Sequence, residues 1–367
     1  MNEDVNNNEQ ENDYSSFMPK ENQEPAATPP ADEAPVEPVS ESSSTGYGFE
    51  RENTEIVWVS QKVNELRREF SNYVIGQHEM VELLLTGIFA NGHILLEGVP
   101  GIAKTLSAKV IAKALDIHFS RIQFTPDMMP SDVIGTSVYN MKDSSFIFNK
   151  GPVFANVVLI DEINRAPAKT QSALFEVMEE RQITYDGQLY PMDFPFLVVA
   201  TQNPVDQEGT YNLPEAQLDR FMFNIWVDYP SYIEELAIVK ATTSDQQLEL
   251  KHILSAEQIM MYQELIRRIP VADNVMEYAV KLVGKTRFSS EFAPQLTKDF
   301  ISWGAGPRAS QYLIVGAKCH AALNGKYSPD IEDVKAVAKP ILRHRIVRNY
   351  KAEAEGYSTD RLIDELL

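Results

Sequence analysis

The chain has 367 residues, of which 44% are hydrophobic, and this length is enough for two packed domains. Its formal net charge of −20 argues against a broad, non-specific nucleic-acid surface, because such surfaces need clustered Lys and Arg. The single cysteine, Cys319, excludes an internal disulfide framework and fits a reducing compartment. We find no long apolar run and no basic, apolar leader, so we expect a cytoplasmic protein without a membrane span.

Residues 1–47 differ in composition from the rest of the chain. They hold eleven acidic residues and one base, Lys20, and they are rich in Asn, Pro and Ser. High charge with few apolar side chains is typical of disorder, so the composition predicts a disordered acidic tail. The alternative is a docking segment for a partner, with Tyr14 and Phe17 as its anchors.

Hydrophobic periodicity predicts an α/β domain over residues 48–228. Apolar residues spaced three and four apart indicate a helix from about Val57 to Tyr73, and a second helix follows through Ala90. Helices, notably 104–115 and 168–181, then alternate with apolar strands near 93–97, 119–124, 157–161, 196–200 and 223–227. This alternation predicts a parallel sheet covered on both faces, with a hairpin inserted at Thr136–Asn149.

The pattern changes at Asp228–Ser231, beyond which we find no convincing buried strand. The periodicity predicts helices at 231–241, 255–268, 272–287, 307–323 and 328–342. Residues 229–367 are therefore expected to form a smaller, all-helical domain.

The segment ILLEGVPGIAKTLSA, residues 94–108, joins an apolar strand to a helix through a glycine-rich turn. Gly98 and Gly101 let the backbone turn its N–H groups inward around phosphates. Lys104 would add a positive charge at the β/γ-phosphates, and the Thr105 hydroxyl would ligate Mg²⁺. Ala103 stands where the usual phosphate-loop pattern has glycine, which leaves an ordinary strand–turn–helix as the alternative. The other residues of the predicted nucleotide-binding loop are Val99, Pro100 and Ile102.

Two further apolar strands end in polar side chains. The strand at 157–160 leads into Asp161, which would hold Mg²⁺ through its water shell, and Glu162, which would act on the attacking water. The strand at 197–201 leads to Asn203, whose amide can hydrogen-bond both a γ-phosphate oxygen and that water. The alternatives are a strand that simply stops in polar residues and an asparagine that starts the turn before Pro204.

Two arginines are candidates for the same chemistry. Arg220 precedes the last strand, where it is either an arginine finger for a neighbouring subunit's γ-phosphate or a surface partner of Asp219 or Glu215. Arg308 follows Pro307 at a predicted helix N-terminus, where its charge opposes the helix dipole unless an anion such as phosphate compensates. A solvated Arg308 is the alternative.

Two other features have competing interpretations. Met128 and Met129 precede the predicted hairpin and either face a central pore or fill the core. The basic stretch from Arg343 to Arg348 is expected to be a solvated helix end or a contact to a neighbouring subunit, in preference to a nucleic-acid site.

Four segments, in order and with the expected spacing, resemble the MoxR family of AAA+ ATPases: GVPGIAKT, VVLIDEINRAP, ATQNPVDQEGTYNLPEAQLDRF and WGAGPRAS. The resemblance covers about residues 55–350, and Ala103 matches this family's version of the loop. The family usually reads Ser-Pro-Arg where this chain has Gly306-Pro307-Arg308, a minor departure. The acidic tail lies outside the resemblance.

The resemblance implies an AAA+ phosphate-loop domain followed by a helical lid, and it gives a role to each matched position. These positions are Lys104 and Thr105 in Walker A, Asp161 and Glu162 in Walker B, Asn203 in sensor 1, Arg220 as arginine finger, Arg308 in sensor 2, and Ile75 and Gly76 in the segment that lines the adenine pocket.

The function that the resemblance implies is Mg²⁺-dependent hydrolysis of ATP by a homo-hexameric ring. ATP would sit between the α/β domain and the lid of one subunit, and Arg220 of the next subunit would complete the site. A chaperone-like role in maturing a partner complex, often one with a von Willebrand factor A domain, is implied as well. Two alternatives stay open: a ring ATPase that translocates nucleic acid, and a scaffold that binds nucleotide without hydrolysing it.

Overall fold

The computed structural model describes residues 44–99, 101, 102, 104–142, 144–203, 210–243 and 250–367. Most of the predicted tail, residues 1–43, lies outside this set. The first described helix, α1 (Ser44–Ser71), begins well before the predicted start at Val57, because weak helix formers such as Gly46 and Gly48 obscure that start. Its buried face has helical spacing and consists of Ile56, Val59, Val63, Leu66 and Phe70.

A five-stranded sheet lies at the centre of the α/β part, and it contains all five predicted strands. The strand order is β2 (Phe119–Gln123), β5 (Val157–Asp161), β8 (Leu197–Gln202), β1 (Ile94–Gly98) and β9 (Phe223–Val227). Every neighbouring pair is parallel, with Ile160 opposite Ala200 and Gly98 opposite Val227. The residues that follow β1, β5 and β8 therefore meet at one edge of the sheet.

Side chains of the sheet alternate between two buried clusters, one on each face. Ile94 and Leu96 join residues of α1, α2 (His78–Phe89) and α3 (Lys104–Ala114) in the first cluster. Leu95 faces the second cluster, which contains Leu174 and Phe175 of α5 (Ala168–Glu180). This burial on both faces explains the nearly continuous apolar strands of the sequence.

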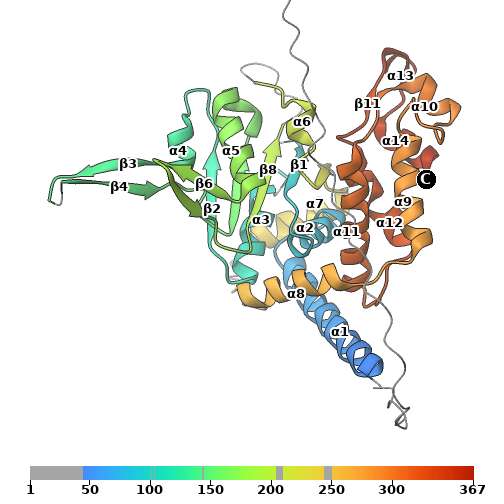
Figure 1. Cartoon of the computed structure of the whole chain (residues 1–367), viewed down its shortest axis with the longest axis horizontal. Coiled ribbons are helices and arrows are strands. Elements are labelled where there is room, and N and C mark those ends of the chain that lie inside the picture. Colours follow the sequence, from blue (N-terminus) through green and yellow to red (C-terminus); the bar gives the residue numbers. More distant parts are fainter. Residues whose placement is uncertain (1–43, 100, 103, 143, 204–209, 244–249) are drawn as a thin grey trace, which may run out of the picture. The chain divides into compact units, whose positions relative to one another are not determined.

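Two antiparallel hairpins are attached to the sheet domain (Figure 1). The predicted hairpin is present as β3 (Gly135–Asn140) and β4 (Ser145–Lys150), and Figure 1 shows it projecting from the sheet. A second hairpin, β6 (Gln182–Tyr185) with β7 (Gln188–Pro191), was not predicted. The Phe148 ring packs on Tyr185 and Tyr190 at centroid distances of 4.8 Å and 4.5 Å, which ties the two hairpins together. Short helical elements complete this part: α4 (Pro130–Ile134), η1 (Ile163–Arg165) and α6 (Glu215–Leu218).

The C-terminal part is helical, as predicted. The predicted helices correspond to α7 (Tyr232–Thr242), α8 (Ala256–Arg268), α9 (Asp273–Lys285), α11 (Pro307–Leu323) and α12 (Ile331–Leu342). The structure adds α10 (Gln295–Phe300), α13 (Tyr350–Ala354), α14 (Thr359–Leu366) and a short antiparallel pair, β10 (Ile301–Trp303) with β11 (Val347–Arg348). Strands of three and two residues are too short to give a periodic signal. Among the described helices, none combines the length and apolarity that crossing a membrane requires.

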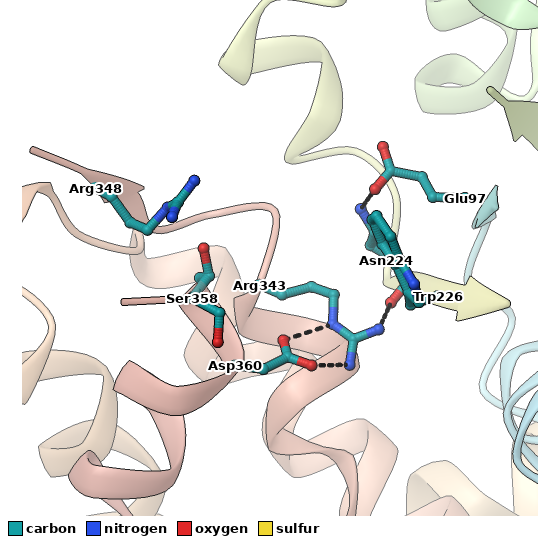
Figure 2. Close-up of a pocket in the computed structure, with 8 residues that line it drawn as sticks. Glu97, Asn224, Trp226, Arg343, Arg348, Ser358 and Asp360 are labelled. Atoms are coloured by element: carbon teal, nitrogen blue, oxygen red, sulfur yellow. Dashed lines mark hydrogen bonds and ion pairs between the residues drawn. The ribbon is translucent and has the colours of Figure 1, made fainter. Parts of the chain in front are cut away.

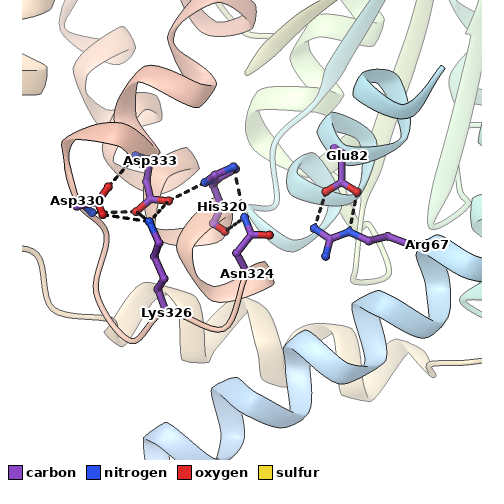
Figure 3. Close-up of polar contacts among 7 residues, drawn as sticks. All are labelled: Arg67, Glu82, His320, Asn324, Lys326, Asp330 and Asp333. Carbon is purple, nitrogen blue, oxygen red and sulfur yellow. Dashed lines mark hydrogen bonds and ion pairs between the residues drawn. The ribbon is translucent and has the colours of Figure 1, made fainter. Parts of the chain in front are cut away.

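An ion pair joins the first two helices (Figure 3). Arg67 of α1 donates two hydrogen bonds of 2.6 Å to the Glu82 carboxylate of α2. Two parallel bonds between planar groups fix orientation as well as distance. The pair therefore sets the direction of α1 against the sheet domain.

A buried carboxylate, Asp333, fixes the start of α12 (Figure 3). Lys326 donates to it at 3.1 Å, His320 Nδ1 lies 2.7 Å from it, and the Asp330 backbone N–H donates at 2.9 Å. Burial alone would raise the pKa of Asp333, but the hydrogen bonds from these partners outweigh that effect and lower the pKa to about 2. Asp333 therefore remains charged in the folded lid at neutral pH.

We expect Asp333→Asn to lower the free energy of unfolding by about 2 kcal/mol at pH 7, because charge-assisted hydrogen bonds are lost. The pKa of Asp333 lies below its ordinary value, so the carboxylate stabilises the fold above about pH 4 and loses this effect as the pH falls towards 2. The free energies of unfolding of the two proteins, measured with urea, should therefore converge as the pH falls. Glu332→Gln, on the exposed side of the same turn, is the control; an equal loss there would contradict the assignment.

Candidate functional site

The turn after β1 requires glycine at two positions. A side chain at Gly98 would collide with the Val227 carbonyl oxygen of β9, and Gly101 has a φ of +86°, which favours glycine. Ile102 is buried in the first core cluster and Val99 packs against that cluster, so contacts with the hydrophobic core hold the loop in place. Two predicted loop residues, Pro100 and Ala103, lie outside the described residues.

Lys104 begins α3 and folds back over the start of this loop. Its Nζ donates a hydrogen bond of 2.6 Å to the Gly98 carbonyl oxygen. Burial lowers the pKa of Lys104, and the carboxylates of Asp161, Glu162 and Glu97 oppose that shift. A half-buried cation facing the loop is suited to exchange a carbonyl partner for phosphate oxygens.

The two predicted Mg²⁺ residues come together. Thr105 Oγ1 lies 3.5 Å from each carboxylate oxygen of Asp161, whose side chain is almost fully buried at the end of β5. Thr201 of β8 donates a hydrogen bond of 3.3 Å to the same carboxylate. Hydroxyl and carboxylate oxygens are the ligands that Mg²⁺ prefers, so this donor set fits the ion directly or through water.

Glu162 is held at the same edge by its backbone and its side chain. It has a left-handed φ of 57°, and its N–H donates to Thr201 Oγ1 at 3.0 Å. Its Oε2 accepts from Gln123 Nε2 at 2.8 Å and pairs with Arg165 Nε at 2.9 Å. The Glu162 side chain, predicted to act on the attacking water, is therefore held by neighbours on β2 and η1.

Sequence reasoning missed Arg121 and Gln123, which lie two residues apart on β2 and point toward β5. Arg121 Nε donates to Asp161 Oδ2 at 2.6 Å, so a cation at Asp161 has to compete with this guanidinium. Two polar residues at alternate positions of a strand are a weak signal in the sequence. Their contacts with Asp161 and Glu162 can be recognised only once the sheet order places β2 beside β5.

Asn203 and the predicted adenine segment also lie at this edge. Asn203 directly follows β8, which pairs with both β5 and β1, and it is buried. Gln77, beside Ile75 and Gly76, donates from its side chain to the Asp228 carbonyl oxygen at 2.9 Å, just past the end of β9. The structure thus brings the described residues of the predicted phosphate loop, Mg²⁺ site, sensor 1 and adenine segment to the carboxyl ends of the strands.

Arg220 and Arg308 form a separate group. Both pair with Glu179 at the end of α5, Arg220 at 3.4 Å and Arg308 at 2.9 Å. Arg308 also lies 3.7 Å from Asp219, which the buried Arg345 holds through a bond of 2.7 Å. The alternative partners expected for Arg220 are Asp219 and Glu215, but the acid that it contacts in the structure is Glu179.

This arginine group lies at the amino ends of the strands. Arg220, Arg308 and Glu179 line one pocket with His93, the residue before β1, and the Met222 N–H donates to the His93 carbonyl at 2.8 Å. From His93 to Gly98 the chain rises about 16 Å at about 3.3 Å per residue. The expectation that Arg308 and the phosphate loop of one subunit enclose the nucleotide is therefore not met, since the lid docks Arg308 at the opposite edge.

A polar chain connects the lid to the phosphate loop (Figure 2). Arg343 donates to the Asp360 carboxylate at 3.1 Å and 2.8 Å and reaches the Asn224 carbonyl at 3.4 Å. The Asn224 side chain donates to Glu97 at 3.0 Å, and burial raises the pKa of Glu97. Because Glu97 directly precedes Gly98, this series of hydrogen bonds ends one residue before the loop.

The structure also gives the surroundings of the basic stretch and of the two methionines. Arg343, Arg345 and Arg348 all have protein partners, so the basic stretch belongs to the lid packing and is not a solvated helix end. Met128 packs against the second core cluster, whereas Met129 is 63% exposed before α4.

Comparisons with known proteins agree with this fold. The profile described as "ATPase family associated with various cellular activities (AAA)" matches residues 93–223, and the profile of the AAA lid domain matches residues 294–366. A parallel sheet with a phosphate loop, followed by this lid, defines an AAA ATPase.

Individual relatives narrow the assignment. Chaperone MoxR1 of Mycobacterium tuberculosis is 43% identical over 314 residues, which cover 84% of this chain and 82% of the relative. YeaC of Bacillus subtilis, named as uncharacterized, is 39% identical over 80% of this chain and 89% of its own length. A crystal structure from Cytophaga hutchinsonii, provisionally assigned as an ATPase, has 44% identity and a TM-score of 0.81 over 88% of this chain and 98% of its own. The chain belongs to the MoxR family of AAA+ ATPases.

Proposed function

We propose that this chain hydrolyses ATP with Mg²⁺ at sites shared between neighbouring copies of a ring. The observation that carries the proposal is the division of its polar groups between two edges of one sheet. Lys104, Thr105, Asp161 and Glu162 lie at the carboxyl edge, and Arg220 with Arg308 lies at the amino edge. One copy cannot bring both groups to one triphosphate, but two copies stacked edge to edge can.

ATP is bound and the attacking water is activated at the carboxyl edge of the sheet. Lys104 exchanges the Gly98 carbonyl for phosphate oxygens, and the N–H groups of the loop surround the phosphates. Thr105 and Asp161 hold Mg²⁺, which neutralises charge on the phosphates when it is bound. Glu162 orients the attacking water and accepts its proton, while the Asn203 amide contacts the same water and a γ-phosphate oxygen.

The arginines of the neighbouring copy stabilise the negative charge on the γ-phosphate. Arg220 and Arg308 both pair with Glu179, so their guanidinium groups lie together where a γ-phosphate can reach them only from a neighbouring copy. An arginine supplied in this way is worth about 10³–10⁵ in turnover. Six copies would close the ring expected from the family. Changes in the angle between the lid and the sheet domain would then move a bound client protein. The name of MoxR1 as a chaperone supports a client of this kind, for which a von Willebrand factor A domain is our candidate.

We expect Lys104→Ala to abolish measurable binding of a fluorescent ATP analogue, because the half-buried cation beside the loop is lost. Fluorescence titration with Mg²⁺ present measures this directly. Lys109→Ala, on the exposed side of the same helix, should bind as the unmodified chain does. Unchanged affinity in Lys104→Ala would contradict the phosphate-loop assignment.

Glu162→Gln should bind ATP normally while turnover falls about 100-fold or more, because an amide cannot accept the proton of water. Phosphate release under saturating ATP is the measurement, with exposed Glu176→Gln on α5 as the control. If the unmodified chain binds ATP and releases no phosphate, the non-hydrolysing scaffold is favoured instead.

Arg220→Ala and Arg308→Ala should each bind ATP but lose turnover, and each should regain activity when mixed with Lys104→Ala. In a 1:1 mixture about one quarter of the contacts between neighbouring copies combine an intact phosphate loop with intact arginines. A mixture of Lys104→Ala with the Lys104→Ala, Arg220→Ala double variant contains no such contact and serves as the control. If Arg308→Ala never recovers while Arg220→Ala does, Arg308 acts within its own subunit and the shared-site arrangement fails for it.

A further inference from the structure

The helix α7 presents an apolar face that nothing described in this chain covers. No side chain of α7 is buried, and the exposed fractions are 80% for Tyr232, 77% for Ile233, 51% for Val239 and 43% for Leu236. We call these four residues the α7 face. Large apolar side chains gathered on one helix at such exposure mark an interaction surface.

The helix has a defined inner side and a defined outer side. Glu234, Ala237 and Ile238, spaced three and four apart, are half-buried against the protein, whereas the α7 face points away. Reciprocal capping by Ser231 and Glu234 secures the first turn, with the Ser231 N–H donating to Glu234 at 2.8 Å. The helix is therefore formed locally and keeps its apolar side available for a partner.

The start of α7 lies at the nucleotide edge of the sheet. Glu234 lies against Gly76, where an added Cβ would be 2.7 Å from the carboxylate, and Gln77 bonds to Asp228 just before the helix. The same edge holds Gly98, which pairs with Val227 at the end of β9. The α7 face thus belongs to the side of the molecule that carries Lys104.

The exposed apolar surface continues along the chain from the edge strand. Trp226 of β9 is 53% exposed and Tyr229 is 69% exposed, immediately before α7. β9 is the outermost strand of the sheet on this side, and Arg343 of the lid already bonds to its Asn224 carbonyl oxygen. A partner seated on the α7 face can cover the exposed rings of Trp226 and Tyr229 as well.

The geometry points to a second copy of this chain as the partner that covers the α7 face. This inference rests on the proposed function: a neighbour whose Arg220 and Arg308 reach Lys104 has to approach the edge where α7 begins. The two copies then meet through opposite edges, so each copy offers its α7 face to one neighbour and its arginines to the other. Such a head-to-tail contact generates a ring when the rotation closes.

The test is Ile233→Glu in the full chain, with Val280→Glu as the matched control. Val280 lies on the lid helix α9 and is 56% exposed, so its substitution adds the same charge to a different apolar site. With Mg²⁺ and ATP, light scattering should show assembly of Ile233→Glu weakened about tenfold or more, while binding of the fluorescent ATP analogue is kept. Retained nucleotide binding and an unchanged melting temperature show that the variant is folded. Assembly equal to that of the unmodified chain would overturn the inference.

A second measurement does not depend on breaking the contact. Ile233→Cys adds one accessible thiol to a chain whose own Cys319 is buried. Maleimide should label this thiol about tenfold or more slowly in the assembled protein than in dilute, nucleotide-free protein. Slow labelling in the monomer would show that another segment of the same chain covers the face, and equal fast labelling in both states would show that nothing does; either result overturns the inference. If assembly and protection occur without phosphate release, the proposed hydrolysis fails and the α7 contact stands.

Discussion

The common direction of five strands is the constraint on which the rest of this structure depends. Because β1, β5 and β8 run the same way, everything that follows them collects at one edge, including Lys104, Asp161 and Glu162. Everything that precedes β1 and β9 collects at the other edge, where Arg220 lies. The sheet therefore separates the groups predicted to bind a triphosphate from the arginines proposed to stabilise its cleavage. In the proposed function, activity then depends on contacts between copies.

The lid completes this separation through a network of ion pairs. Arg345, almost fully buried, holds Asp219, and Asp219 in turn lies beside Arg308. Glu179 joins Arg308 to Arg220. Among these groups Arg345 is the buried one, so breaking its pair with Asp219 would leave a charge without solvent. Because Arg308 belongs to the lid, a lid movement would shift it at the proposed contact with the next copy. On the other side, the bonds from Arg343 through Asn224 to Glu97 give the lid a second connection, to the phosphate loop.

Sequence reasoning succeeded where the signal is local. The five sheet strands and the main helices follow from periodicity, and the loop from Gly98 to Thr105 follows from its glycines and its lysine. It failed where the signal is short or non-local. The hairpin at Gln182–Pro191 is polar and depends on rings such as Phe148 in the other hairpin. Arg121 looks like an ordinary strand residue until β2 is placed next to β5 and its guanidinium meets Asp161.

The sequence by itself determined the class of fold, the glycine turn after β1 and the polar residues that end the strands, because backbone turns and apolar spacing are encoded by near neighbours. Only the tertiary structure decided on which edge each of those residues acts. Arg308 is about 200 residues beyond Lys104 along the chain, and its place was set by how the lid packs, through Asp219 and Glu179. The uncovered face of α7 was likewise decided by packing, since a run of apolar residues in a helix does not reveal which of them the fold leaves outside.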